Sequence, residues 1–336
     1  MKSMWRVMAA GVAVTGLAAS LASAQSVISA QSGVVHYTEG RVLLGDKAIE
    51  PKFGEFPNIK EGGVLRTEEG RAEVLLTPGV FLRAAEGTSF RMVSNRLVDT
   101  RLVLERGSVL LECLELPKDN AVTIVTGDAS ISLRKQGLYR IDAEPPLLRV
   151  YDGEAVVESG SQRVTVKRGK QAALAGVLVA GKFNNKVGDP LYRWSRRRSE
   201  YVALANLSGS KSLLDRGYQW SASGWHWNPY FGLFTFVPYR GTLYSPFGYA
   251  FWSPRSVMNV YHPPVQAYRP DFSAGGGRSW AGGYDTGSMS RSSGVYSVPS
   301  GSSSGAVSPG AAGSGAAASP RGGESVRDSG GGGRGR

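Results

Sequence analysis

The feature that most constrains the fold is a long succession of short β-type segments between about Val34 and Phe183. Runs rich in valine, isoleucine, leucine and threonine recur there at intervals of roughly 8–12 residues, separated by glycine or charged turns. Some runs, such as residues 164–167, place valine at every second position, which turns one face inward and the other outward. No helical pattern interrupts the region. The sequence therefore predicts an all-β domain over 34–184, antiparallel or coiled into a rolled, solenoid-like form.

The first 24 residues have the features of an export signal. Lys2 and Arg6 precede an apolar, alanine-rich run from Val7 to Leu21, and the small residues 22–24 are typical of a cleavage site. The alternative is that this segment is retained as a membrane anchor. Since no later run reaches about 18 apolar residues, we expect no transmembrane segment in the mature chain. We expect the protein to be exported, to the periplasm or the cell surface.

The single cysteine, Cys113, lies in an apolar run, where we expect it to be a buried small hydrophobe; a reactive thiol is the alternative. Charge is unevenly distributed along the chain. Residues 189–336 hold 15 Lys/Arg and 7 Asp/Glu, whereas residues 25–188 hold 22 and 20. A basic exported segment favours anionic envelope polymers or lipid surfaces as partners, and export makes nucleic acid a poor one.

After Lys186 the pattern becomes helical. Asp189 and Pro190 form a favourable N-cap and first turn, so we expect one amphipathic helix over 189–207. Its apolar positions are Leu191, Trp194, Tyr201, Val202 and Ala205. Its solvent face is expected to carry Arg193, Arg196, Arg197, Arg198 and Glu200. We expect Trp194 to dock on the β-domain; an alternative role for the helix is binding to an anionic surface.

Residues 225–252 contain twelve Trp, Tyr or Phe and a single charge, on Arg240. Three runs with a period of two, separated by turns, predict a small three-stranded aromatic β-meander built from two related hairpin arms, within a module at 218–256. Most of the rings must be packed to offset the ordering of the chain. For the rings that are not packed, the alternatives are a platform on which a sugar or polymer stacks and a contact patch for a protein or membrane.

From about residue 270 to 336 the chain is rich in glycine, serine and alanine. Such a composition buries too little apolar surface to offset backbone ordering, so we expect a disordered, basic tail. The tail would add weak electrostatic attraction to anionic envelope components.

No catalytic motif is evident in the sequence. His36, His226 and His262 are far apart, and neither metal-ligand spacings, a nucleophile elbow nor a phosphate-binding glycine loop occurs. We expect the acidic pairs Glu68/Glu69 and Glu112/Glu115 to face solvent and His226 to be packed or hydrogen-bonded. We therefore expect a non-enzymatic protein without a cofactor or a metal.

The strand-and-turn pattern resembles a known family. Residues Leu65–Met92 read LRTEEGRAEVLLTPGVFLRAAEGTSFRM, and the likeness continues through LVLERGSVLLE, VTIVTGDASISLRKQGLYRID and LRVYDGEAVVESGSQRVTVKRGKQ. These segments are similar to the FecR-type periplasmic domain, from about Tyr37 to Ala173. Two places depart from the family pattern. Pro78 stands where an aspartate is usual before the turn glycine, and residues 137–139, Gly-Leu-Tyr, stand where Gly-Thr-x-aromatic is usual.

The resemblance implies a β-module used for interaction in the cell envelope. Signalling members of the family have a cytoplasmic domain and a membrane span; because we expect the N-terminus here to be a removable signal, we expect neither and do not carry the transmembrane role over. We expect an exported, non-catalytic FecR-domain protein, an interaction or signalling-accessory module that contacts an envelope protein or an anionic envelope polymer. The alternative is carbohydrate or peptidoglycan binding through exposed rings. The candidate contact residues are Trp225, Trp227, Tyr230, Trp252, Arg196, Arg197 and Arg198.

Overall fold

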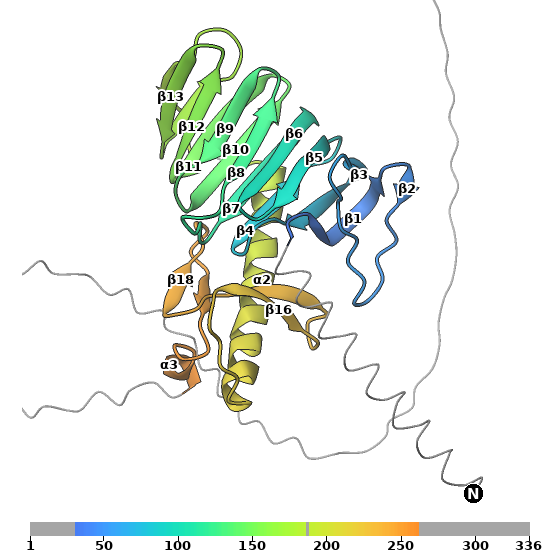
Figure 1. Ribbon diagram of the computed structural model, residues 1–336, viewed down its shortest axis with the longest axis vertical. Helices are drawn as coiled ribbons and strands as arrows, with labels where there is room; N and C mark the ends of the chain where they lie inside the picture. The colour runs from blue at the N-terminus through green and yellow to red at the C-terminus, as the bar shows by residue number, and fades with distance from the viewer. Residues whose placement is uncertain (1–30, 186–187, 262–336) are drawn as a thin grey trace, which may run out of the picture. The chain divides into compact units, whose positions relative to one another are not determined.

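The computed structural model of the protein describes residues 31–185 and 188–261. The expected signal peptide at 1–24 and the expected disordered tail at 270–336 lie outside the described residues. Strands dominate the described part, and one long helix and short hairpins follow them (Figure 1).

The first fifteen strands form one sheet. They are β1 (Val34–Leu44), β2 (Lys47–Ala48), β3 (Val64–Leu75), β4 (Val80–Ala84), β5 (Ser89–Arg96), β6 (Asp99–Arg106), β7 (Ser108–Cys113), β8 (Val122–Thr126), β9 (Ala129–Leu133), β10 (Gly137–Ala143), β11 (Pro146–Asp152), β12 (Glu154–Ser159), β13 (Gln162–Lys167), β14 (Lys170–Ala173) and β15 (Ala180–Lys182).

The sheet curls into a nearly closed roll, which we call the β-domain. Its order is β13-β12-β9-β8-β6-β5-β3-β4-β7-β10-β11-β14-β15, with β1 paired to β3 and β2 to β1. The two ends of this order meet, because β13 also contacts β14 and β15. The pairs are antiparallel except for β6 and β8, which run parallel. The prediction of a rolled all-β domain is confirmed.

The interior of the roll is the main hydrophobic core, and strands β4 and β7 and the last four residues of β3 are buried on both faces. Val74, Leu82 and Leu111 point into the core of the roll. Residues such as Phe81 and Leu110 on the opposite face pack under the helix and hairpins that follow. A strand that is covered on both faces has apolar residues at consecutive positions, which accounts for the run of valine and leucine in β7.

Cys113 belongs to the inner core, as expected, and burial raises the pKa of its thiol to about 12. A thiol with so high a pKa stays protonated at neutral pH and is a poor nucleophile.

The turn between β11 and β12 shows why glycine is needed before a strand. Gly153 has φ = 90°, a region that favours glycine. A Cβ there would overlap the hydroxyl of Tyr139. That hydroxyl donates to the Lys135 carbonyl at 2.6 Å and accepts from the Glu154 N–H at 3.0 Å. The tight turn and the buried tyrosine therefore depend on each other.

Helix α2 (Pro190–Asp215) begins as the sequence predicts, with the Asp189 side chain accepting the Tyr192 N–H at 2.8 Å. It ends eight residues beyond the predicted end at 207, although this last part is rich in serine and glycine. These small residues are buried: Gly209 faces the ring of His226, and Ser210 donates to the Trp252 carbonyl at 2.6 Å. Tertiary packing thus overrides low helix propensity here.

The aromatic segment forms two separate hairpins. Strands β16 (Gly224–Asn228) and β17 (Leu233–Val237) make one, β18 (Thr242–Tyr244) and β19 (Ala250–Trp252) the other, and the short helix α3 (Met258–Tyr261) follows. Hairpins were expected, but the three-stranded meander was wrong in its pairing.

The side chain of Asn206, on α2, lies between the two hairpins. It donates to the carbonyls of Phe236 (2.9 Å) and Trp252 (3.0 Å) and accepts the Trp252 N–H at 2.6 Å. These backbone groups of β17 and β19 are therefore satisfied by the helix and not by each other. We call α2 and the two hairpins the helix–hairpin module. Within the described residues, no helix has the length and hydropathy needed to span a membrane.

Candidate interaction surfaces

A cluster of buried charges joins the β-domain to the helix–hairpin module. We call it the buried ion cluster, and its members are His36, Glu73, Arg83, Glu112 and Arg198. The side chains of Glu73, Arg83 and Glu112 have no solvent exposure. Glu73 and Arg83 face each other across β3 and β4, and Glu112 on β7 opposes Phe81, two residues along β4. Strand register therefore brings all three to the face that α2 covers.

The bonds within the buried ion cluster pair two carboxylates with two guanidinium groups. Arg83 donates to Glu73 at 2.7 Å and to Glu112 at 2.5 Å. Arg198, from α2, donates to Glu73 at 2.9 Å. Ser199 donates to Glu112 at 2.6 Å, and Ser245, before β19, donates to the same carboxylate oxygen. Charge is balanced locally, which a buried cluster needs in order to offset desolvation.

His36 sits at a β-bulge, where the register of β1 against β3 shifts between Val35 and Tyr37. Its Nε2 accepts the backbone N–H of Phe234, on β17, at 3.0 Å. The proton is therefore on Nδ1, which donates to Glu73 at 2.9 Å. Burial lowers the pKa of His36, opposed by its bond to Glu73, so the ring is neutral near pH 7.

The pKa of the Glu73 carboxyl follows from two opposed effects. Burial raises it, but the adjacent guanidinium groups of Arg198 and Arg83 lower it more, and the pKa lies well below its ordinary value. Glu73 is therefore ionised at neutral pH and serves as the acceptor that ties β1, β4 and α2 together.

Two sequence predictions are wrong at this cluster. Glu112 was expected to face solvent, but it is fully buried because β7 is covered on both faces. Arg198 was expected on the solvent face of α2, but it points to Glu73 and is 9% exposed. Glu68 and Glu69 are exposed as expected, and so are Arg196 and Arg197. Trp194 docks on Leu110 and Leu138 of the β-domain, as predicted.

The candidate aromatic residues fall into different environments. Trp225 is 1% exposed and packs edge-on against Phe81 at 5.1 Å, so its assignment as a ligand contact is wrong. Trp227 and Trp252 are partly buried. Tyr230, in contrast, is 87% exposed. Period-two patterning identified the strands but did not show that β17 has both faces covered.

An exposed aromatic surface crosses the boundary between the β-domain and the helix–hairpin module. We call it the junction patch; its members are the exposed residues Tyr37, Phe53, Tyr201, Leu204 and Tyr230, with the partly buried Phe231. Ring contacts link Tyr201 to Phe231 at 5.5 Å and Phe231 to Tyr230 at 5.4 Å. The Arg198 guanidinium lies over both Tyr37 (3.9 Å) and Tyr201 (5.6 Å). Phe53 is 79% exposed and abuts Gly232, the residue after Phe231.

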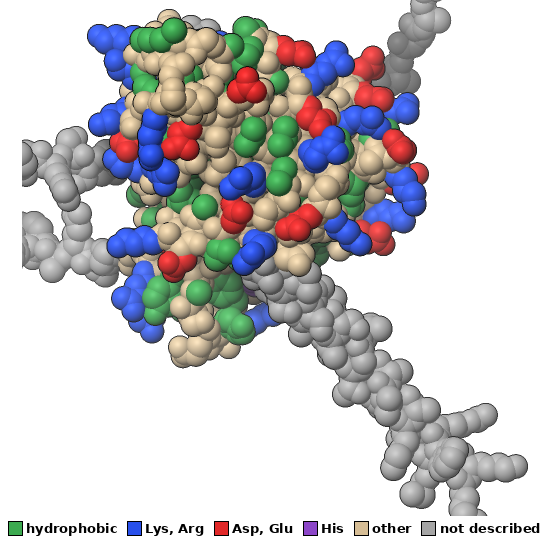
Figure 2. Space-filling model, turned by 45° about the horizontal axis from the view of Figure 1, so that its top comes forward, with side chains coloured by type: hydrophobic (Ala, Val, Ile, Leu, Met, Phe, Trp, Pro, Cys, Tyr) green, Lys and Arg blue, Asp and Glu red, His purple; other side chains and the backbone are tan. Residues whose placement is uncertain are grey.

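The sequence did not identify the junction patch. Tyr201 was expected on the apolar, docked face of α2, but it is exposed. Tyr37 and Phe53 lie in the β-domain, far from the aromatic segment in sequence. Elsewhere, the face of the β-domain seen in Figure 2 carries Lys/Arg and Asp/Glu side chains interspersed, without a field of one sign.

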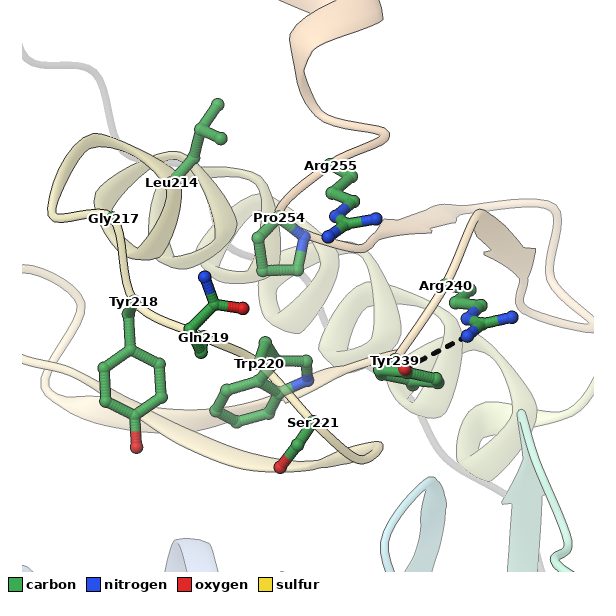
Figure 3. Close-up of a pocket in the computed structure, with 10 residues that line it drawn as sticks. All are labelled: Leu214, Gly217, Tyr218, Gln219, Trp220, Ser221, Tyr239, Arg240, Pro254 and Arg255. Atoms are coloured by element: carbon green, nitrogen blue, oxygen red, sulfur yellow. Dashed lines mark hydrogen bonds between the residues drawn. The ribbon is translucent and has the colours of Figure 1, made fainter.

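A pocket of about 300 Å³ lies at the C-terminal end of α2 (Figure 3). We call it the α2-end pocket. Its lining residues are Leu214, Gly217, Tyr218, Gln219, Trp220, Ser221, Tyr239, Arg240, Pro254 and Arg255. No Asp or Glu side chain lines it.

His226 packs beside this region, edge-on to Trp220 at 6.1 Å. Its ring also faces Gly209, so the prediction of a packed histidine is confirmed. Burial, together with the charge of Arg216, lowers the pKa of His226 to about 4. Among the described residues, no group of three or more His, Cys, Asp or Glu side chains is arranged to hold a metal ion.

Comparisons with known proteins identify no family for the chain. No family model matches the sequence, and no curated protein matches it. Two crystal structures, each of a candidate anti-sigma factor from Parabacteroides distasonis ATCC 8503, match 37% and 36% of this chain at 13% identity. Their TM-scores are 0.33 and 0.31, values too low to establish a shared fold, and the matches span only about three fifths (61% and 59%) of those chains.

Proposed function

We propose that the protein is an exported, non-catalytic interaction module of the cell envelope, in which a FecR-like β-domain supports a contact surface for another envelope protein. The observation that carries the proposal is the junction patch. It presents exposed aromatic rings from three separate parts of the chain: β1 and the loop after β2, helix α2, and the β16–β17 turn.

Large exposed rings are unfavourable in water unless a partner covers them. The junction patch is rich in tyrosine and phenylalanine, and the buried Arg198 guanidinium lies over the rings of Tyr37 and Tyr201. Exposed aromatic side chains contribute much of the binding energy at protein interfaces.

The junction patch is held in place before any partner binds. Tyr201 is on α2, which the buried ion cluster fixes to the β-domain through the bond from Arg198 to Glu73. Phe231 follows Asn228, whose side chain donates to the Ala205 carbonyl of α2 at 2.8 Å. A preformed surface reduces the ordering cost of association.

The border of the junction patch carries charges of both signs. Arg197 is exposed and precedes Tyr201 by one helical turn, so both lie on the same face of α2. Glu200 adjoins Tyr201, and Lys52 and Glu55 lie on either side of Phe53; all three are exposed. The apolar rings, and not a field of one sign, therefore distinguish this surface.

Site-specific photo-crosslinking tests the proposal. A photoreactive phenylalanine analogue at Tyr230 should give a covalent adduct with a specific protein in envelope extract of the native host. The same analogue at Tyr244, another exposed tyrosine, is the matched control and should give none. The Tyr201→Ala change should reduce the Tyr230 adduct at least tenfold. Equal labelling from both positions, or no adduct from Tyr230, would contradict a protein partner at this surface.

A further inference from the structure

The α2-end pocket lies outside the junction patch and is built from four segments: the end of α2, the loop that follows it, the turn after β17 and the loop after β19. Backbone and side-chain bonds hold these segments together. Tyr218 donates its N–H to Leu213 at 3.0 Å, and Trp220 donates from its indole to the Val237 carbonyl at 3.2 Å. The Tyr239 N–H donates to the Ser223 hydroxyl at 2.9 Å.

The charge of the pocket is positive. Arg240 and Arg255 line it, both are exposed, and neither forms an ion pair within the described residues. The Arg240 guanidinium lies 4.6 Å from the ring of Tyr239 and donates to its hydroxyl at 3.1 Å. That single bond uses one of five guanidinium N–H donors and leaves the others for a ligand.

One effect opposes an anion here, because the C-terminal end of a helix carries a partial negative charge of about half a unit. The last turn of α2 is already capped: the carbonyls of Ser212, Leu213 and Leu214 accept N–H groups from Arg216, Tyr218 and Gly217. Two full positive charges outweigh the remaining dipole. The pocket is therefore complementary to an anion.

The walls of the pocket are aromatic as well as charged. In the view of Figure 3, Tyr218, Trp220 and Tyr239 lie in a row beneath Pro254 and Arg255. The Tyr218 and Trp220 rings are tilted by 52° with centroids 6.2 Å apart, and Tyr218 is 61% exposed. Gln219 and Ser221 add uncharged hydrogen-bonding groups beside these rings. Aromatic faces with neutral polar neighbours suit the apolar face and hydroxyls of a sugar ring.

We propose that the α2-end pocket binds an anionic sugar, with a ring stacked on Trp220 and Tyr218 and the acidic group held by Arg240 and Arg255. The volume of about 300 Å³ is at the lower end of the range for small-ligand sites, which suits one or two sugar rings. A free carboxylate would leave the rings unused, and a neutral sugar would leave the arginines unused. The inference does not depend on the junction patch or its partner.

Isothermal titration calorimetry of the full chain tests this with two disaccharides: N-acetylglucosaminyl-N-acetylmuramic acid, which carries a carboxylate, and chitobiose, a neutral counterpart. The carboxylated probe should bind at least tenfold more tightly, and its affinity should fall as salt rises. Equal affinity for chitobiose, or no binding of the carboxylated disaccharide, overturns the proposal. Tighter binding of an acidic peptide than of either sugar would also overturn it, in favour of a protein ligand.

Substitutions in the α2-end pocket test whether the sugar probes bind there. The double change Arg240→Gln and Arg255→Gln should weaken the carboxylated probe at least tenfold, and Tyr218→Ala should weaken both probes. All three side chains are exposed, so the fold should be retained. The matched control is Arg106→Gln with Arg134→Gln, two exposed arginines of the β-domain, which should leave affinity unchanged. An equal loss in this control would show that net charge, not the pocket, attracts the sugar. Crosslinking at Tyr230 is a separate readout, so failure of either proposal leaves the other testable.

Discussion

Arg198 donates a hydrogen bond to Glu73 at 2.9 Å, although the two residues are 125 positions apart in the chain. The bond crosses from helix α2 to strand β3 and is buried, with no exposure of the Glu73 side chain. It fixes the helix–hairpin module on the β-domain and, at the same time, holds the Arg198 guanidinium over the rings of Tyr37 and Tyr201. A buried charge pair thus supports an exposed aromatic surface.

Glu73→Gln should strongly destabilise the fold. The change leaves Arg83 and Arg198 without their shared carboxylate, and removal of one partner from a buried pair costs about 3–5 kcal/mol. The control is Glu158→Gln, because Glu158 pairs with Arg163 on the surface, where a loss of about 0–1 kcal/mol is expected. Urea unfolding measures both free energies. Similar small losses in the two variants would show that the buried ion cluster contributes little.

Acidification should destabilise the protein before its carboxylates titrate. Unfolded His226 has its ordinary pKa of 6.5, whereas the folded value is about 4. Between these values the unfolded state binds the extra proton, so stability falls as pH falls. The loss from His226 at pH 5 relative to pH 7 is about 2 kcal/mol. The pKa of His36 is also lowered in the folded protein, so His36 likewise makes stability fall as pH falls. The stability from ionised Glu73 is lost only at lower pH, below its ordinary value of 4.5.

His226→Phe tests this assignment, since phenylalanine keeps a ring against Trp220 and cannot be protonated. Urea unfolding of the variant should show a smaller loss of stability between pH 7 and pH 5 than the unmodified protein. An identical loss in both proteins would mean that His226 does not titrate in this window.

Gly153→Ala should be much more damaging than Gly127→Ala. Both glycines precede strands and have positive φ, so each change incurs backbone strain of about 1–2 kcal/mol. Only at Gly153 would the new methyl group also overlap the Tyr139 hydroxyl; at Gly127 the space is open. Thermal unfolding of the two variants gives the comparison. Equal melting temperatures would contradict the tight contact at Tyr139.

Trp225→Ala should destabilise the protein by about 3–5 kcal/mol, as removal of a large core ring does. Trp225 contacts Phe81 of β4 and Phe236 of β17, so it joins the two parts of the molecule. Tyr230→Ala, at an 87% exposed residue, should leave the free energy of unfolding within about 0.5 kcal/mol of the original. A ligand-binding role for Trp225 would instead be indicated by a stable variant.

Much of the β-domain could be predicted from the sequence, because the signals for its strands and turns lie in short stretches of neighbouring residues. Period-two runs and turn glycines identify the strands, and Asp189-Pro190 identifies the start of α2. Cys113 reads as a core residue for the same reason. Each of these assignments depends on neighbours within a few positions, which a single sequence displays directly.

The candidate surfaces could not be predicted, because they depend on which faces are covered after folding. Glu112 appears solvent-facing by residue type and is buried only because α2 covers the outside of β7. Arg198 follows two exposed arginines and differs from them only in pointing at Glu73. The end of α2 was missed because serine and glycine suit a helix terminus in isolation but here allow close packing of the hairpins.

A double-mutant cycle between Glu73 and Arg198 tests most directly whether the helix–hairpin module is fixed to the β-domain, on which the junction patch depends. Free energies of unfolding are measured for Glu73→Gln, Arg198→Gln and the double variant, with Arg197→Gln as the matched exposed partner. We expect a coupling energy of about 1–3 kcal/mol for Glu73 with Arg198, and additivity within about 0.5 kcal/mol for Glu73 with Arg197. Additive effects in both cycles would contradict the docking of α2 through this pair.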